Sequence, residues 1–412
     1  MLGGNHPVII WLERWHLLAL RQTSAKRYAL VVAFVSFLFV TTLAWPQSCT
    51  PDFVITPTPN GPQHNRLRGV VAFDVNDVWA VGFTNGTNDQ TLTEHWDGSS
   101  WTIVSSPNQD AFSALSAVGG IATNDLWAVG SFHATPGFHP DQTLTEHWDG
   151  ICPRCGHSKG RLQTCRSHPA QWSIVPSPNL QGFDLLNAVA AVATDDVWAV
   201  GEDSLPNPLF MHWDGQTWTL VDPPPDAGPQ IAVAALASND VWSAGSGRSS
   251  DNTGLFNHWD GTSWTTIPNP PITPGSVTIR ALSALAPNDI WAAGSLFFES
   301  CDDTCFDSET VTVLHWDGQS WSMVRAPMAS IWARLTGIAA QSSASVWAVG
   351  FENAQTLASH WDGTRWTNAP NIQLGAGTFF EGVSVAGGDA WAVGWSAFPG
   401  KDQTLAVRYR CD

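Results

Sequence analysis

The chain has 412 residues, with 36 acidic and 18 basic side chains, so its formal charge at neutral pH is −18. This charge excludes an electrostatic nucleic-acid binder, which needs clustered Lys and Arg. There are 24 Trp and only 2 Tyr, which excludes chemistry that depends on several tyrosines. Gly and Pro are abundant, at 35 and 27 residues, but 43% of the chain is hydrophobic. This composition predicts a packed, β-rich globular protein rather than a disordered one.

The N-terminal region predicts export. Residues 28–45 form an uncharged apolar run, preceded by Arg21, Lys26 and Arg27, and no Lys or Arg follows until Arg66. This asymmetry predicts a cytoplasmic n-region over residues 1–27 and a signal peptide or signal-anchor helix over residues 28–45. We therefore expect an extracytoplasmic protein that meets the membrane only through this segment, either secreted after cleavage or anchored by it.

The rest of the chain repeats one pattern. A W-[AS]-[VA]-G motif begins at Trp79, Trp127, Trp198, Trp242, Trp291, Trp347 and Trp391. Six copies are followed by H-W-D-G, which begins at His95, His147, His212, His258, His315 and His360. Five of the six intervals between the W-[AS]-[VA]-G motifs are 44–56 residues long. A repeat of this length predicts the blades of a β-propeller rather than a helical solenoid.

Each repeat predicts four short strands, separated by Asn-Asp or Asp-Asp, a variable loop, and Asp-Gly. The seventh copy lacks its fourth strand, and residues 53–60 near the N-terminus align with the fourth strand at residues 101–108. We therefore expect an all-β protein over residues 46–412. It is a seven-bladed β-propeller of four-stranded blades, closed by the N-terminal strand and preceded by one N-terminal hydrophobic helix. We expect a monomer.

Four cysteines suggest disulfides. In the alignment Cys49 and Cys411 fall in one hairpin turn at the seam of the ring, which in an exported chain predicts a disulfide. The alternative is two unpaired thiols. Cys301 and Cys305 are close enough in sequence for a local disulfide. Their loop also carries four acids, and we favour a solvated acidic loop over a Ca²⁺ site because the spacing of a Ca²⁺-binding loop is missing.

An insertion in blade 2, residues 151–170, contains C-x2-C-x9-C-x2-H. Its Cys152, Cys155, Cys165 and His168 have the residue types and spacing of a tetrahedral zinc site. The alternatives are a disulfide from Cys165 to Cys152 or Cys155, and a disordered insertion. Structural zinc is the only cofactor that the sequence suggests.

The repeated His and Asp residues predict structure rather than catalysis, because each recurs once per blade. We expect each Asp of the Asp-Gly turns to cap its hairpin, and each His to pair with backbone or with a neighbouring blade. The variable loops lie on the opposite face of the ring, where a ligand is expected. Aromatic candidates for binding in these loops are Phe132, Phe138, Phe297, Phe298, Phe351 and Trp395.

The W-A-V-G … D-G-x-x-W pattern of residues 53–412 resembles bacterial Asp-box propeller repeats of the sialidase-like and photosystem-assembly-factor type, and more loosely kelch repeats. A sialidase of this type implies an arginine cluster and a Tyr nucleophile, and a kelch-type oxidase implies a second Tyr. The propeller region has only Tyr409. We therefore expect a non-enzymatic binding or scaffold propeller whose variable-loop face takes a protein or carbohydrate partner at the cell exterior.

Two other functions stay open on the sequence. One is a glycan-binding lectin. The other is a two-carboxylate glycoside hydrolase, which needs two acids about 5–10 Å apart. Its candidate acids are Glu202, Asp203, Glu352 and Glu381.

Overall fold

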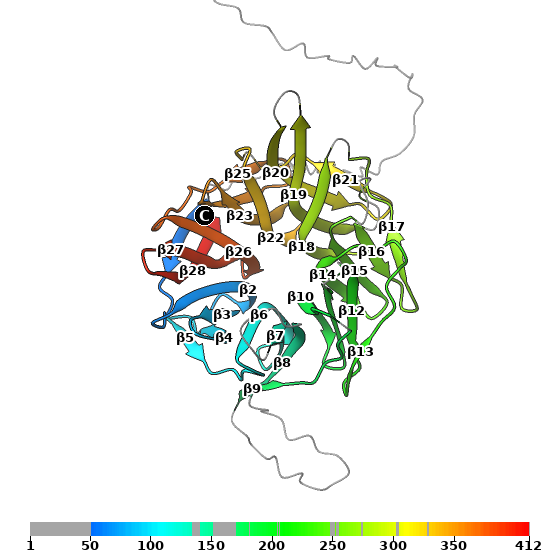
Figure 1. Cartoon of the computed structure of the whole chain (residues 1–412). Helices are drawn as coiled ribbons and strands as arrows, with labels where there is room; N and C mark the ends of the chain where they lie inside the picture. Colours follow the sequence, from blue (N-terminus) through cyan, green and yellow to red (C-terminus); the bar gives the residue numbers. More distant parts are fainter. Residues whose placement is uncertain are drawn as a thin grey trace, which may run out of the picture. The chain divides into compact units, whose positions relative to one another are not determined.

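The computed structural model describes residues 51–133, 141–150, 170–180, 182–203, 205, 207–247, 252, 255–272, 275–301, 305–327 and 329–411. This part of the chain forms seven four-stranded antiparallel sheets around a central axis (Figure 1). The predicted all-β, seven-bladed propeller of four-stranded blades is confirmed. The predicted helix over 28–45, Cys49, and the four proposed zinc ligands lie outside the described residues. Among the described residues, no helix is long and apolar enough to cross a membrane.

In blades 1 to 6 the first strand in the chain is innermost and the fourth is outermost. Blade 1 contains β2 (His64–Asp74), β3 (Asp77–Asn85), β4 (Asp89–Trp96) and β5 (Trp101–Val104). Blade 2 contains β6 (Phe112–Ala122), β7 (Asp125–His133), β8 (Gln142–Asp149) and β9 (Gln171–Ile174). Blade 3 contains β10 (Leu185–Ala193), β11 (Asp196–Glu202), β12 (Pro208–Trp213) and β13 (Trp218–Leu220). Blade 4 contains β14 (Gln230–Ala237), β15 (Asp240–Gly245), β16 (Phe256–Trp259) and β17 (Trp264–Ile267).

The remaining three blades follow the same order. Blade 5 contains β18 (Ser276–Ala286), β19 (Asp289–Cys301), β20 (Cys305–Trp316) and β21 (Trp321–Val324). Blade 6 contains β22 (Ala333–Ser342), β23 (Ser345–Glu352), β24 (Gln355–Trp361) and β25 (Trp366–Asn368). Blade 7 contains β26 (Gly377–Ala386), β27 (Asp389–Phe398), β28 (Lys401–Cys411) and, as its outermost strand, β1 (Pro51–Thr56).

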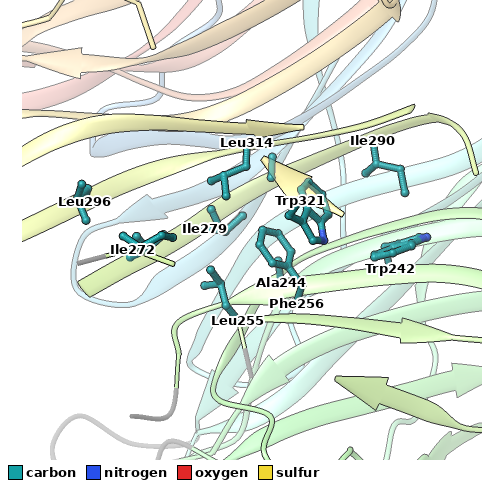
Figure 2. Close-up of a cluster of buried hydrophobic side chains, with 12 residues drawn as sticks. Trp242, Ala244, Leu255, Phe256, Ile272, Ile279, Ile290, Leu296, Leu314 and Trp321 are labelled. Carbon is teal, nitrogen blue, oxygen red and sulfur yellow. The ribbon is translucent and has the colours of Figure 1, made fainter. Parts of the chain in front are cut away.

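The core lies between neighbouring blades, and the repeated Trp residues fill it. Trp242 of blade 4 is 3% exposed. Its ring centroid lies 4.9 Å from Trp316 and 5.9 Å from Trp321, both in blade 5. Figure 2 shows the same interface with Phe256, which stacks on Trp321 at 4.0 Å. Burying such large side chains between blades is the main apolar contribution to the stability of the ring.

In five of the six Asp-Gly turns the Asp caps its hairpin, as predicted. Asp97 Oδ1 accepts hydrogen bonds from the amides of Ser99 and Ser100, at 2.8 and 2.9 Å. Gly98 has φ +93°, a conformation that favours glycine. The same turn recurs at Asp214, Asp260, Asp317 and Asp362.

The predicted partner of the repeated His is wrong, because the His pairs within its own blade. His95 lies opposite Trp79 in the β3–β4 register and stacks on its indole at 4.4 Å. This places His95 Nε2 2.9 Å from Oδ1 of Asp77, at the start of β3. The equivalent pairs are His147–Asp125, His212–Asp196, His258–Asp240 and His315–Asp289.

These pairs give a first testable prediction. Asp240 Oδ1 accepts from both His258 Nε2 and Trp242 Nε1, each at 2.9 Å. We expect Asp240→Ala to lower the free energy of unfolding by about 1–3 kcal/mol, because both donors lose this acceptor. Urea denaturation measures the loss. The control is Ser345→Ala in blade 6, where His360 bonds a neutral hydroxyl at 3.0 Å and a smaller loss is expected. Equal losses in the two variants would contradict the role given to the carboxylate.

The seventh blade takes its outermost strand from the other end of the described chain. β1 pairs antiparallel with β28, and Phe53 lies opposite Tyr409 as Trp101 lies opposite Trp96 in blade 1. Cys411 lies opposite Pro51. Cys49 falls outside the described residues, so the seam disulfide stays a prediction.

The variable loop expected around Cys301 and Cys305 is much shorter in the structure than its sequence suggests. The strands β19 and β20 continue through it, and Cys301 is the backbone partner of Cys305 at the tip of the hairpin. The residues of this stretch continue the antiparallel ladder because Phe and Thr, which are strand formers, lie on both sides of the acidic tip. The Cys301–Cys305 disulfide stays a prediction.

Candidate functional site: the mouth of the central channel

The innermost strand of every blade carries a β-bulge at the same repeat position. In β2 the register shifts between Leu67 and Gly69, which makes Arg68 the extra residue. The channel at the axis is lined by these bulge residues, one from each blade: Arg68, Ser116, Asn187, Ile231, Arg280, Thr336 and Glu381. Bulges re-aim side chains, so seven related strands present seven chemically different groups to one cavity.

The bulges lie near the start of the innermost strands, at the end that faces away from the Asn-Asp turns. The channel mouth therefore opens on the variable-loop face, where a ligand is expected. The cavity at this mouth has a volume of about 410 Å³ and is also lined by Arg334 and Phe351. Figure 1 shows the innermost strands arranged around the axis of the ring.

Three arginines of an otherwise acidic ring line the mouth, and a fourth, Arg66, lies close enough for its charge to act on Glu381 there. Arg66 binds Asp402 with Nε at 2.7 Å and Nη2 at 2.6 Å. Arg334 Nη2 lies 2.6 Å from Glu309 Oε2, and Arg280 Nη2 lies 4.0 Å from the other oxygen of that carboxylate. Arg66 and Arg334 are therefore neutralised by close ion pairs, whereas Arg280 is paired only at the limit of an ion-pair distance.

Arg68 has no ion pair with any acid of the described residues, and its guanidinium lies 4.7 Å from the ring centroid of Phe83. Burial lowers the pKa of Arg68, and the nearby charge of Glu381 opposes that change. Burial lowers the pKa of Arg280 as well, with Arg334 adding repulsion. Both bulge arginines thus hold a positive charge that is poorly solvated and incompletely paired.

Glu381 is the one acidic residue among the described residues that line the channel cavity. Burial raises its pKa, while the hydrogen bond from Trp395 Nε1 at 3.1 Å and the charges of Arg68, Arg66 and Arg280 oppose that rise. Its carboxylate is thus oriented by an indole and surrounded by arginines. An incoming anion would meet these arginines, and an incoming cation would meet Glu381.

Of the predicted aromatic residues, Phe351 lines the mouth, and Trp395 donates a hydrogen bond to Glu381, which also lines it. Phe351 contacts Phe379 at 5.1 Å between centroids, and Phe379 stacks on Trp395 at 4.5 Å. The Arg66 guanidinium lies 3.9 Å above Trp395, and that of Arg334 lies 5.4 Å from Phe351. The aromatic row therefore supports the arginines through cation–π contacts.

The other predicted binding residues lie elsewhere or are partly buried. Phe132 packs against the core between blades 1 and 2, and Phe298 packs against the core between blades 4 and 5. Phe297, on β19, is 39% exposed. Phe138 falls outside the described residues.

The predicted carboxylates have separate structural contacts. Asp203 accepts from the amides of Leu205 and Asn207 in its own loop. Glu352 accepts from the amide of Ser330 and from Asn371. Of the four candidate acids, only Glu381 lines the channel cavity. The expectation that the chain is not an enzyme stays a prediction. Among the residues that the structure describes, no group of three His, Cys, Asp or Glu could hold a metal ion.

The sequence analysis did not identify the arginines or Phe379 as site residues. A signal for three charged residues of the site does exist in the sequence. When the innermost strands of the seven repeats are aligned, Arg68, Arg280 and Glu381 occupy the same position, where the other repeats have small or uncharged residues. The β-bulge that directs the side chains at this position toward the axis has no marker in the sequence. A prediction that ignores the bulge and assumes strict alternation of side chains places these residues on the face of the strand that points away from the channel.

No protein-family model matches the chain, and no curated protein matches it. Several solved structures, however, have a similar fold. YCF48 bound to D1 peptide has a TM-score of 0.51 at 12% identity, covering 88% of this chain and 97% of that one. YCF48 from Cyanidioschyzon merolae has a TM-score of 0.50 at 15% identity, covering 87% and 98%. The WD40 β-propeller domain of Doa1 has a TM-score of 0.52 at 14% identity, covering 86% and 96%.

These likenesses define the class of the protein as a β-propeller, and at such low identity they show the fold alone. They give no support to the narrower resemblance to Asp-box or kelch repeats.

Proposed function

We propose that this propeller is a non-enzymatic, extracytoplasmic scaffold that binds an acidic segment of a partner protein at the channel mouth. The observation that carries the proposal is the gathering of Arg66, Arg68, Arg280 and Arg334 at or near one opening of an acidic protein. Arg68 and Arg280 hold charge that the described acids only partly neutralise. An incoming carboxylate would complete their pairing, and bidentate Arg–carboxylate pairs are among the strongest polar contacts.

Two further observations support a peptide rather than a glycan at this mouth. Phe351, Phe379 and Trp395 stack on one another, and the Arg66 guanidinium lies over Trp395. The faces of these rings are therefore already in contact with other side chains, which leaves little ring surface on which a sugar could stack. A structure of similar fold, YCF48, is bound to a D1 peptide. The propeller fold is thus compatible with peptide binding.

The test uses a displayed library of random peptides selected on the propeller, residues 46–412. We expect the selected peptides to be enriched in Asp and Glu, and their affinity to fall as salt is raised. The double variant R68S/R280T, which carries the residue types found at this position in blades 2 and 6, is expected to weaken binding at least tenfold.

The matched control is Arg410→Ser, which removes one positive charge from the seam strand and is expected to leave binding unchanged. Selection of no acidic peptide, or equal binding by the double variant, would refute the proposal.

A further inference from the structure

One of the six interfaces that contain three Trp residues departs from the pattern of the others. In five, the W-[AS]-[VA]-G indole lies 4.7–5.3 Å from the third-strand Trp of the next blade, and 5.1–5.9 Å from its fourth-strand Trp. Between blades 5 and 6 these distances are 5.9 Å, from Trp291 to Trp361, and 6.4 Å, from Trp291 to Trp366. The two indoles of blade 6 therefore stand further from their neighbour.

Trp366 is correspondingly less buried than its equivalents. The other fourth-strand Trp residues are only 3–5% exposed: Trp101, Trp172, Trp218, Trp264 and Trp321. Trp366 is only partly buried. A pocket of about 230 Å³ lies at this position, lined by Trp361, Thr364, Arg365 and Trp366 of blade 6 and by Arg325 and Ala326 of blade 5.

The two arginines of this pocket are themselves exceptions to the repeat. The residue four places after the fourth-strand Trp is Ser, Pro, Asp, Pro or Pro in the other five blades that have this Trp, and Arg325 in blade 5. The residue just before that Trp is Ser, Gln or Thr in the other blades, and Arg365 in blade 6. Two departures in adjacent blades thus supply both walls of one pocket.

The charge at the pocket is only partly balanced. Arg365 Nε lies 3.6 Å from Asp362 Oδ2, while the other oxygen of Asp362 accepts from the amides of Thr364 and Arg365. Arg325 has no ion pair with an acid of the described residues. A guanidinium without a carboxylate partner therefore lies beside two partly exposed indoles. This arrangement suits a ligand that has an anionic group, which the guanidinium would bind, and a ring, which would pack on an indole.

We infer that this pocket is a second binding site, separate from the channel mouth, for a carboxylated sugar such as a uronic acid. The C–H groups of a pyranose ring would pack on Trp361 or Trp366, and its carboxylate would bind Arg325 and Arg365. The volume is below the usual 300–1,000 Å³ of sites for drug-sized ligands, so the pocket fits a single sugar unit, either free or at the end of an acidic glycan.

The test measures binding of D-glucuronate and of D-glucose by saturation-transfer NMR and by calorimetry. We expect glucuronate to bind at least ten times more tightly than glucose. The double variant R325S/R365S places at both positions the residues of blade 1, Ser105 and Ser100, so the fold should tolerate it. It is expected to lower glucuronate affinity at least tenfold, and Trp366→Leu is expected to weaken it as well.

The two proposed sites are tested independently. R68S/R280T is expected to bind glucuronate normally, and R325S/R365S is expected to keep the acidic peptides. Equal affinity for glucuronate and glucose, unchanged binding by R325S/R365S, or binding of benzoate at this pocket without binding of glucuronate would overturn the inference. Loss of glucuronate binding in R68S/R280T would place the sugar at the channel mouth and would overturn it too.

Discussion

Replacing Glu94 or Glu146 with methionine is expected to stabilise the propeller strongly at pH 8 and much less at pH 5. Both glutamates are fully buried in third strands, at 0% exposure, and neither carboxylate oxygen of either has a hydrogen-bond partner among the described residues. Burial raises the pKa of each to about 8, from an ordinary value of 4.5. An unpartnered buried carboxyl is costly to ionise, so the folded protein keeps both protonated near neutral pH.

The sign of the pH dependence follows from proton binding. Between pH 4.5 and 8 the unfolded chain has lost these protons while the folded chain retains them, so stability falls as the pH rises through this window. Below pH 4.5 both states are protonated, and this loss is absent. Since one pKa unit corresponds to 1.36 kcal/mol, the loss at pH 8 is on the order of 4 kcal/mol per carboxyl.

The chain itself offers the matched controls. The position of Glu94 and Glu146 is occupied by Met211 in blade 3 and by Leu314 in blade 5. Leu314→Glu is therefore expected to create the same loss of stability with rising pH. Guanidinium denaturation at pH 5 and pH 8 measures all three variants. A stability gain in Glu94→Met that is the same at both pH values would show that this carboxyl is ionised in the folded state.

The sequence was sufficient for the architecture because the information there is repeated seven times. Trp79 and its equivalents, the Asp-Gly turns and the missing fourth strand of the last copy each predict an element that the structure contains. Two features could not be predicted in this way. The bulge at Arg68, which recurs in every blade, has no marker in the sequence, and the ladder of β19 and β20 continues where a loop was expected.

The candidate sites were harder to predict because they depend on differences between repeats. Arg68, Arg280 and Glu381 come together only because three bulges aim at one axis. Arg325 and Arg365 are 40 residues apart and meet across two blades. Aromatic residues in the loops predicted a site less well, since Phe132 and Phe298 pack against the core. Residues that differ from their equivalents in the other repeats therefore indicated the candidate sites better than aromatic residues in the loops did.

Removing β1 is expected to have the largest destabilising effect of any change to the ring. Phe53 of β1 packs against Tyr409 at 5.9 Å, and Tyr409 is fully buried. Thr56 Oγ1 donates to the carbonyl of Ala406 and accepts from Trp101 Nε1, which connects blade 7 to blade 1. Beyond the strand, Asn60 Oδ1 accepts from the amide of Thr404 at 2.8 Å, as Asn108 accepts from Thr91 in blade 1.

These contacts set the scale of the loss. Burial of one large side chain contributes about 1.5–3 kcal/mol and each net hydrogen bond about 1 kcal/mol, so losing the strand costs on the order of 5 kcal/mol or more. That is comparable with the whole stability of many proteins. The loss also leaves β28 as an uncovered edge, which promotes aggregation.

The experiment compares a chain that begins at residue 51 with one that begins at residue 63. We expect the shorter chain to melt more than 10 °C lower, or to aggregate. A circular permutant tests whether the strand stabilises the ring by completing blade 7, whichever end of the chain it is attached to. It begins at Gln63 and carries residues 53–62 after Tyr409, joined by the Asp-Gly-Ser-Ser turn of blade 1. It is expected to recover most of the lost stability, because the strand then returns to the same edge through the tight turn that five blades use. A permutant no more stable than the shorter chain would mean that β1 does not complete the seventh blade.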